Sequence, residues 1–154
     1  MVDATGPDTL GFGRPDLVVD IRATPQSVRD ALLVIDGQLA DWGLSGVRQT
    51  DIRIVLAEAL NNVVEHAYPR LSDGRITLAL WRAAHHVDCE IRDTGAPMTE
   101  KALPQGRLPS LAARAVRDLP EGGFGWVLIR QLTTGLRYRR IGGENRLSLR
   151  LRLD

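Results

Sequence analysis

The chain reads EALNNVVEHAY at residues 58–68, a helical pattern in which Glu58, Asn62 and His66 recur every four residues. At this spacing the three side chains form one narrow polar stripe along a helix. Five apolar residues fill the adjoining arc, so the stripe should border the buried face: Ile52, Leu56, Ala59, Val63 and Ala67. A carboxylate can accept a proton from a hydroxyl, and a carboxamide oxygen can complete the coordination shell of magnesium. The alternative is a surface helix whose polar residues are only solvated.

A second motif, Asp93-Thr94-Gly95-Ala96-Pro97, follows an apolar stretch that is typical of a strand. A carboxylate at a strand end can accept a hydrogen bond from an exocyclic amine, and a nearby glycine lets a flat ring approach the backbone. This combination favours recognition of adenine. The same five residues also form an ordinary turn, which is the alternative interpretation.

A third motif, Gly122-Gly123-Phe124-Gly125, stands directly before a helical pattern. Free backbone N–H groups at the positive end of a helix can hold phosphate oxygens. The motif is not a Walker P-loop, because no Gly-Lys-Ser/Thr follows it. A plain loop at the start of a helix is the alternative.

The elements around these motifs set the fold class. Periodicity and turn residues predict a strand over 17–21, helices over 25–42 and 46–68, strands joined at 84–86, a long loop over 94–122 with a helix-compatible stretch at 111–119, a helix over 124–132 and strands around the glycines at 142–143. This order predicts an α/β two-layer sandwich, with helices packed on one mostly antiparallel sheet. Residues 1–14 are expected to be a flexible lead-in, and residues 15–154 a single domain.

Composition limits the function classes. Hydrophobic residues make up 44% and charged residues 25% of the 154 residues, as in an average soluble protein. The net charge of +1 and the alternation of leucine with arginine near the C-terminus favour a solvated strand face over a nucleic-acid patch. No stretch is long and apolar enough for a membrane span, and a single cysteine, Cys89, fits a reducing compartment, so we expect a cytoplasmic protein with neither nucleic acid nor membrane as partner.

Together the three motifs carry a family resemblance. EALNNVVEHAY, IRDTGAP at residues 91–97 and EGGFGWVLIRQL at residues 121–132 resemble the N-box and the two glycine boxes of the histidine-kinase-like ATPase (GHKL) superfamily. More narrowly, residues 15–154 resemble the small stand-alone anti-sigma factor serine kinases of bacteria. The resemblance implies the Bergerat-type fold, in which ATP lies between the helical layer and a lid and magnesium bridges the phosphates.

The resemblance also implies roles for individual residues. Glu58 matches the general base, Asn62 the magnesium-ligating asparagine and Asp93 the adenine-reading carboxylate. His66 matches the N-box histidine that lines the cleft, although a neutral histidine satisfied within the core is an equally open interpretation. The expected cofactor-binding residues are Asn62, His66, Asp93, Gly95, Met98, Gly123, Phe124 and Gly125.

The function implied is an ATP- and magnesium-dependent serine/threonine kinase that phosphorylates a small antagonist protein and switches between that antagonist and a sigma factor. Self-association is a further expectation, because the relatives assemble as dimers and the N-terminal strand and helix offer a free edge and an apolar face. Glu121, which is acidic where related kinases often carry a basic or hydroxyl residue, favours an alternative, a nucleotide-gated binding module with little kinase activity. A non-enzymatic interaction domain with a degenerate pocket is a third possibility.

Overall fold

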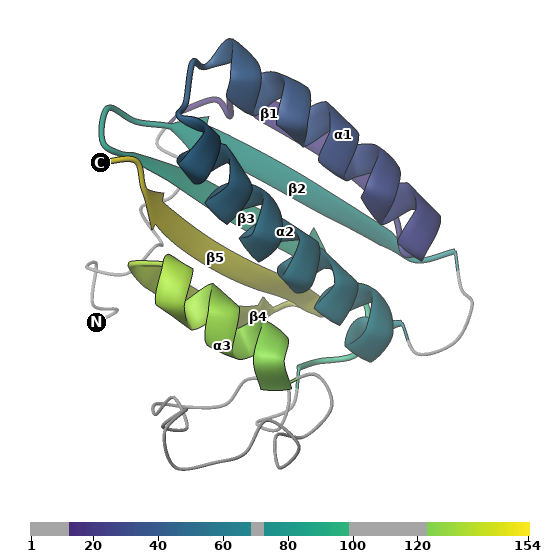
Figure 1. The fold of residues 1–154 in the computed structure, drawn as a ribbon. Coiled ribbons are helices and arrows are strands. Elements are labelled where there is room, and N and C mark those ends of the chain that lie inside the picture. The colour runs from purple at the N-terminus through teal and green to yellow at the C-terminus, as the bar shows by residue number, and fades with distance from the viewer. Residues whose placement is uncertain (1–12, 69–72, 99–122) are drawn as a thin grey trace.

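The computed structural model describes residues 13–68, 73–98 and 123–154. In this part of the chain, three helices pack on one face of a five-stranded sheet (Figure 1). The elements follow one another as β1 (Leu17–Arg22), α1 (Pro25–Asp41), α2 (Gly46–Ala67), β2 (Arg75–Arg82), β3 (His86–Asp93), α3 (Gly123–Leu132), β4 (Gly135–Ile141) and β5 (Glu144–Arg152). The predicted fold class is confirmed, and the predicted elements that fall within the described ranges are present with small shifts at their ends.

The strands lie in the order β1-β2-β3-β5-β4, and each neighbouring pair is antiparallel. The last strand, β5, therefore inserts between β3 and β4, and its first residues lie beside the end of β3. In this register Asp93 stands directly opposite Asn145. The C-terminal hairpin thus borders the second sequence motif, which is 52 residues away along the chain.

Local signals fix the ends of the two long helices. Thr24 caps α1 by accepting a hydrogen bond from the Ser27 N–H, and Pro25 occupies the first turn, where its missing N–H costs nothing. Gly43, with a φ of +70°, follows the end of α1 in the left-handed region. Ser45 caps α2 through the Arg48 N–H. These signals fix where α1 begins and ends and where α2 begins.

The core lies between the helices and the sheet. The predicted apolar arc of α2 is fully buried, and Leu147, Leu149 and Leu151 of β5 form the buried phase of that strand, as predicted. Ser148 differs from the expectation of a wet position, since it is only 3% exposed. It lies between Glu90 and Arg137 of the neighbouring strands, which explains its burial.

Several predictions concern residues outside the described ranges. These include most of the flexible lead-in, the long loop from residue 99 with its helix-compatible stretch, and Glu121. The division into a lead-in and one domain stays a prediction. Among the described residues, no helix combines the length and apolar character that crossing a bilayer requires.

Candidate functional site

The middle of α2 and the start of α3 bring two of the predicted motifs together. Glu58 on α2 faces Gly125 in the first turn of α3, where Gly125 is buried. A Cβ atom on Gly125 would lie 3.3 Å from Glu58 Cδ and still closer to its carboxylate oxygen. Glycine at this position therefore leaves the room that the Glu58 carboxylate occupies. The candidate base and the second glycine box are direct neighbours.

Asn62 lies one turn further along α2 and is only 5% exposed. Its Nδ2 group is buried and has no hydrogen-bond partner among the described residues. An unpaired buried amide costs free energy, so such a group usually has a water, a ligand or an ion as its partner. Asn62 thus has the burial and the free polar group expected of a residue that contacts a bound polar ligand.

The C-terminal end of α2 contacts the loop after β3. The Ala96 N–H donates to the Ala67 carbonyl oxygen at 3.0 Å. A Cβ atom on Gly95 would lie 2.5 Å from that same oxygen and 2.8 Å from Ala67 Cβ. We expected glycine here for the approach of a flat ring, but the neighbour that excludes a side chain is the end of the helix.

Asp93, the last residue of β3, is 4% exposed. Its Oδ1 accepts hydrogen bonds from the Gly95 N–H at 2.9 Å and from Asn145 Nδ2 at 2.8 Å. Burial raises the pKa of Asp93 above its ordinary value, while these two hydrogen bonds and the Arg140 guanidinium oppose the rise. Among the described residues the carboxylate is therefore held through Oδ1, and Oδ2 can serve as an acceptor for a ligand.

Asn145 was not predicted to belong to the site. Its Nδ2 donates to Asp93 Oδ1 and to the Ala96 carbonyl at 3.0 Å, and its Oδ1 accepts from Tyr138 Oη at 2.6 Å and from Arg140 Nη1 at 2.8 Å. One sequence signal could have identified it. Asn145 occupies the same phase of β5 as the buried leucines, and a polar residue in a buried phase needs partners.

Two tyrosines hold the ends of the loop. Tyr68 Oη accepts from the Thr94 N–H and donates to the Arg75 carbonyl, both at 3.1 Å. Tyr138 Oη accepts from the Met98 N–H at 3.0 Å, and Met98 packs half-buried against the core. With Pro97 lacking an N–H, every backbone donor from residue 94 to residue 98 is hydrogen-bonded. The loop is therefore ordered by the protein itself.

The remaining predicted residues lie at the end of α2 and at the start of α3. His66 is exposed in the last turn of α2, so the interpretation as a histidine buried in the core is wrong. Gly123 begins α3, as the helix-start motif requires, and the side chain of Phe124 lies outside the described part of the structure. The structure thus brings Glu58 to Gly125 and anchors Asp93 and Gly95 at the far end of α2.

The donor set fits a nucleotide with magnesium. Magnesium usually takes one or two protein oxygens and completes its shell with phosphates and water. Asn62 Oδ1 could supply one such oxygen, and the buried Nδ2, an N–H donor without a partner among the described residues, could donate to a phosphate oxygen. Among the described residues, no group of three or more His, Cys, Asp or Glu side chains could form a metal site made of protein ligands alone.

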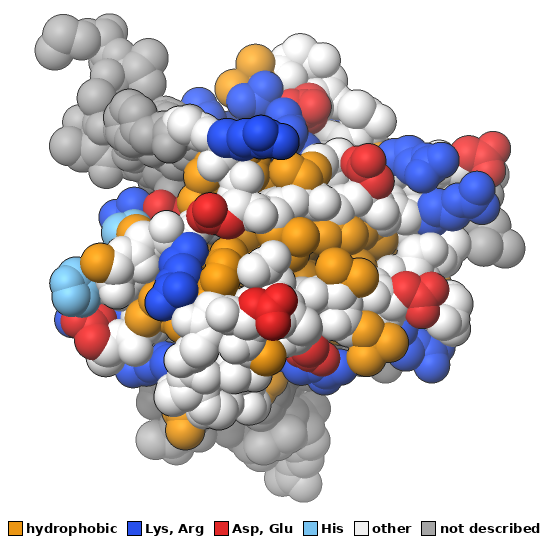
Figure 2. Space-filling model, turned by 90° about the horizontal axis from the view of Figure 1, so that it is seen from above, with side chains coloured by type: hydrophobic (Ala, Val, Ile, Leu, Met, Phe, Trp, Pro, Cys, Tyr) orange, Lys and Arg blue, Asp and Glu red, His pale blue; other side chains and the backbone are white. Residues whose placement is uncertain are grey.

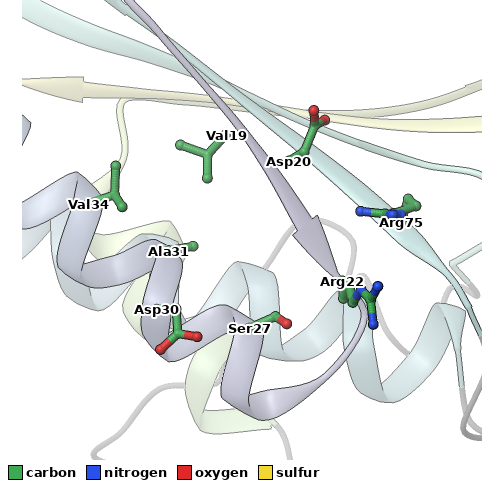
Figure 3. Close-up of a pocket in the computed structure, with 8 residues that line it drawn as sticks. All are labelled: Val19, Asp20, Arg22, Ser27, Asp30, Ala31, Val34 and Arg75. Carbon is green, nitrogen blue, oxygen red and sulfur yellow. The ribbon is translucent and has the colours of Figure 1, made fainter.

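A separate groove of about 350 Å³ lies between β1 and α1 and includes none of the predicted site residues (Figure 3). Val19 of β1 and Ala31 and Val34 of α1 line its apolar part. Figure 2 views the molecule from this side and shows hydrophobic side chains gathered in a band between charged ones. Among the described strands, β1 lies at one edge of the sheet, and the groove runs along that edge.

The fold and the three motifs, all of which lie on or border α2, agree with an ATP-binding protein of the GHKL class. The chain belongs to the family described as the histidine kinase-like ATPase domain, whose model matches residues 21–152.

Within this family, the chain is similar to several protein kinases. The chain is 30% identical to the serine-protein kinase RsbW of Oceanobacillus iheyensis, over 73% of this chain and 71% of the relative. It is 31% identical to the serine/threonine-protein kinase BtrW of Bordetella bronchiseptica, over 85% of this chain and 89% of the relative. It is 29% identical to the anti-sigma F factor of Bacillus velezensis, over 52% of each chain.

A solved structure shares the fold. The SiaB–SiaC complex from Pseudomonas aeruginosa contains a chain that superposes with a TM-score of 0.65 at 14% identity, covering 90% of this chain and 91% of that one. At this identity the likeness shows the fold alone.

Proposed function

We propose that the protein is an ATP-dependent serine/threonine kinase that phosphorylates a serine of a small antagonist protein and alternates between that antagonist and a sigma factor. The observation that carries the proposal is the convergence of Glu58 and Gly125, with the unpaired amide of Asn62 one turn away. Relatives named serine-protein kinase and anti-sigma F factor support the kind of partner. Because such partners regulate transcription, we propose the cytoplasm as the compartment.

In this proposal Glu58 accepts the proton of the substrate serine as its oxygen forms a bond to the terminal phosphorus of ATP. The bond between that phosphorus and the bridging oxygen breaks, and ADP leaves with the oxygen. Magnesium, when bound with ATP, offsets the negative charge of the phosphates. Asn62 supplies a metal ligand, and the backbone of Gly123 and Gly125 at the start of α3 holds phosphate oxygens.

The other end of the site, at Asp93, binds the adenine ring of ATP. Asp93 accepts a hydrogen bond from the 6-amino group of adenine, and Gly95 keeps the loop against α2. Met98 offers an apolar contact beside the ring, and the exposed His66 and the side chain of Phe124 are proposed to border the nucleotide. These roles extend from the sequence resemblance and fit the positions of the described residues.

The first experiment removes the proposed general base, the carboxylate of Glu58. Glu58→Gln keeps the shape of the side chain and removes most of its basicity, so phosphate transfer to the antagonist should fall by roughly 100- to 10,000-fold, the usual contribution of a general base. ATP affinity, measured by calorimetry, should change little. The control is Glu65→Gln, an exposed glutamate on the same helix, which should leave both quantities unchanged.

The second experiment removes the metal ligand. Asn62→Ala should weaken magnesium-dependent ATP binding as well as transfer, whereas the exposed neighbour Asn61→Ala should affect neither. If the wild-type protein binds ATP tightly but transfers no phosphate to any candidate antagonist, the kinase proposal fails. The nucleotide-gated binding module, which the acidic Glu121 favours, then replaces it.

A further inference from the structure

We propose that Asn145 is a positioning residue for nucleotide recognition, which holds the Asp93 carboxylate by Oδ1 so that Oδ2 is left to accept from the 6-amino group of the base. The inference rests on the proposed function, because it assumes that Asp93 reads adenine. It adds a residue from the C-terminal hairpin that none of the three sequence motifs contains.

The contacts of Asn145 determine which way its amide faces. Nδ2 points at acceptors only, namely Asp93 Oδ1 at 2.8 Å and the carbonyls of Ala96 and Gly95 at 3.0 and 3.3 Å. Oδ1 points at donors only, the Tyr138 hydroxyl at 2.6 Å and Arg140 Nη1 at 2.8 Å. The side chain is 2% exposed, so water cannot replace these partners freely. An aspartate at position 145 could not donate to Asp93, and a leucine there could neither donate to Asp93 nor accept from Tyr138 and Arg140.

This arrangement bears on recognition because a terminal carboxylate has a broad torsional minimum and would otherwise rotate. Anchored at Oδ1 by Asn145 and by the Gly95 N–H, the Asp93 carboxylate presents one oxygen in one direction. A 6-amino group can donate to that oxygen, whereas a 6-oxo group would place two acceptors against each other. Loss of the anchor should therefore reduce discrimination between the two kinds of base.

The hairpin residues that contact Asn145 also hold the loop at residues 94–98. Arg140 Nη1 donates to the Gly95 carbonyl at 2.9 Å as well as to Asn145 Oδ1. Tyr138 bonds both the Met98 N–H and Asn145 Oδ1. The hairpin therefore grips the loop and the carboxylate through one connected network, and Asn145 is the member that touches Asp93.

The test compares the affinities of the 154-residue chain for ATP and for inosine triphosphate, which carries a 6-oxo group in place of the amine. Asn145→Ala should weaken ATP on the order of 10- to 100-fold, the range for a lost hydrogen bond to a charged group, and should weaken inosine triphosphate much less. The ratio of the two affinities should therefore fall. Asn61→Ala, an exposed asparagine on α2, should leave the ratio unchanged.

Tyr138→Phe is a second variant, in case Asn145→Ala does not fold, because it removes only a hydroxyl group. It should lower the ratio of the ATP affinity to the inosine triphosphate affinity by a smaller factor. In an Asp93→Asn background, Asn145→Ala should produce no further loss of discrimination. Equal weakening of both nucleotides in Asn145→Ala and Tyr138→Phe would indicate a merely structural role and overturn the inference. So would a ratio that stays at the wild-type value in both.

Asp93→Asn alone separates the proposed adenine site from the proposed role of Asn145. If it leaves ATP affinity unchanged, the adenine site of the proposed function is wrong, and the inference falls with it. If it weakens ATP while both hairpin variants keep the wild-type ratio, the proposed function stands and only the role of Asn145 is rejected.

Discussion

Replacing Gly95 by alanine should destabilise the protein and weaken ATP binding together. The new methyl group would lie 2.5 Å from the Ala67 carbonyl oxygen and 2.8 Å from Ala67 Cβ. The oxygen is a backbone atom at the end of α2, and the Cβ atom belongs to a side chain that cannot rotate away, so neither can make room for the methyl group. The loop itself must move away from α2.

The size of the effect follows from these contacts. Overpacking of this kind costs about 1–3 kcal/mol. Moving the loop also lengthens the Ala96–Ala67 hydrogen bond, which contributes about 1 kcal/mol. Together the free energy of unfolding should fall by roughly 2–4 kcal/mol. ATP affinity should fall as well, because the Gly95 N–H is one of the two donors that hold Asp93.

The assay is denaturant unfolding, followed by calorimetry with ATP. Gly37→Ala is the matched control, because Gly37 lies within α1 and a Cβ atom there would meet nothing within 4 Å. That variant should gain about 0.5–1 kcal/mol from the better helix propensity of alanine and keep its ATP affinity. A Gly95→Ala protein as stable as the wild type would refute the reasoning.

Three further outcomes are expected. Gly125→Ala should leave stability nearly unchanged, because the atom that it meets is the flexible end of Glu58, yet it should lower phosphate transfer at least about 10-fold by displacing that carboxylate; normal turnover would argue against Glu58 as the base. Asp93→Asn should stabilise the protein at neutral pH while weakening ATP about 10- to 100-fold. Burial raises the pKa of Asp93 in the folded protein above its value in the unfolded chain. The free energy of unfolding of the wild type, relative to that of Asp93→Asn, should therefore fall as the pH rises from the unfolded-state pKa through the folded-state pKa. A difference between the two free energies that does not change with pH would contradict this. Val34→Arg, at a position that is 51% exposed beside the free edge of β1, should shift any self-association toward monomer in sedimentation experiments; a wild-type protein that is monomeric at all concentrations would exclude this interface.

The sequence was sufficient for the helices and for one half of the site, because their signals are local. Thr24 and Pro25 mark the start of α1, and Gly43 marks its end within one turn of the pattern they terminate. The four-residue spacing of Glu58 and Asn62 likewise predicts that they share a face of α2, whatever the rest of the chain does. Periodicity and capping act over a few residues, so a sequence displays them directly.

The other half of the site depends on strand register, which spacing along the chain does not show. Asn145 meets Asp93 only because β5 inserts between β3 and β4 and places the two residues opposite each other. Tyr138 and Arg140 reach the loop through the same insertion. The arginine-rich hairpin could be predicted as a half-buried pair of strands, but its contribution to a binding loop could not.

The interpretation of Gly95 shows that a position can require glycine for a different reason from the one its motif suggests. A glycine in this motif suggests room for a ligand, yet the closest neighbours of its missing side chain are atoms of Ala67 at the end of α2. The loop is held by that helix end on one side and by Tyr138 and Asn145 on the other, and all its backbone donors are satisfied. A loop ordered in this way loses little conformational entropy when a base binds, so the affinity at the adenine end should arise mainly from Asp93 rather than from rearrangement of the loop.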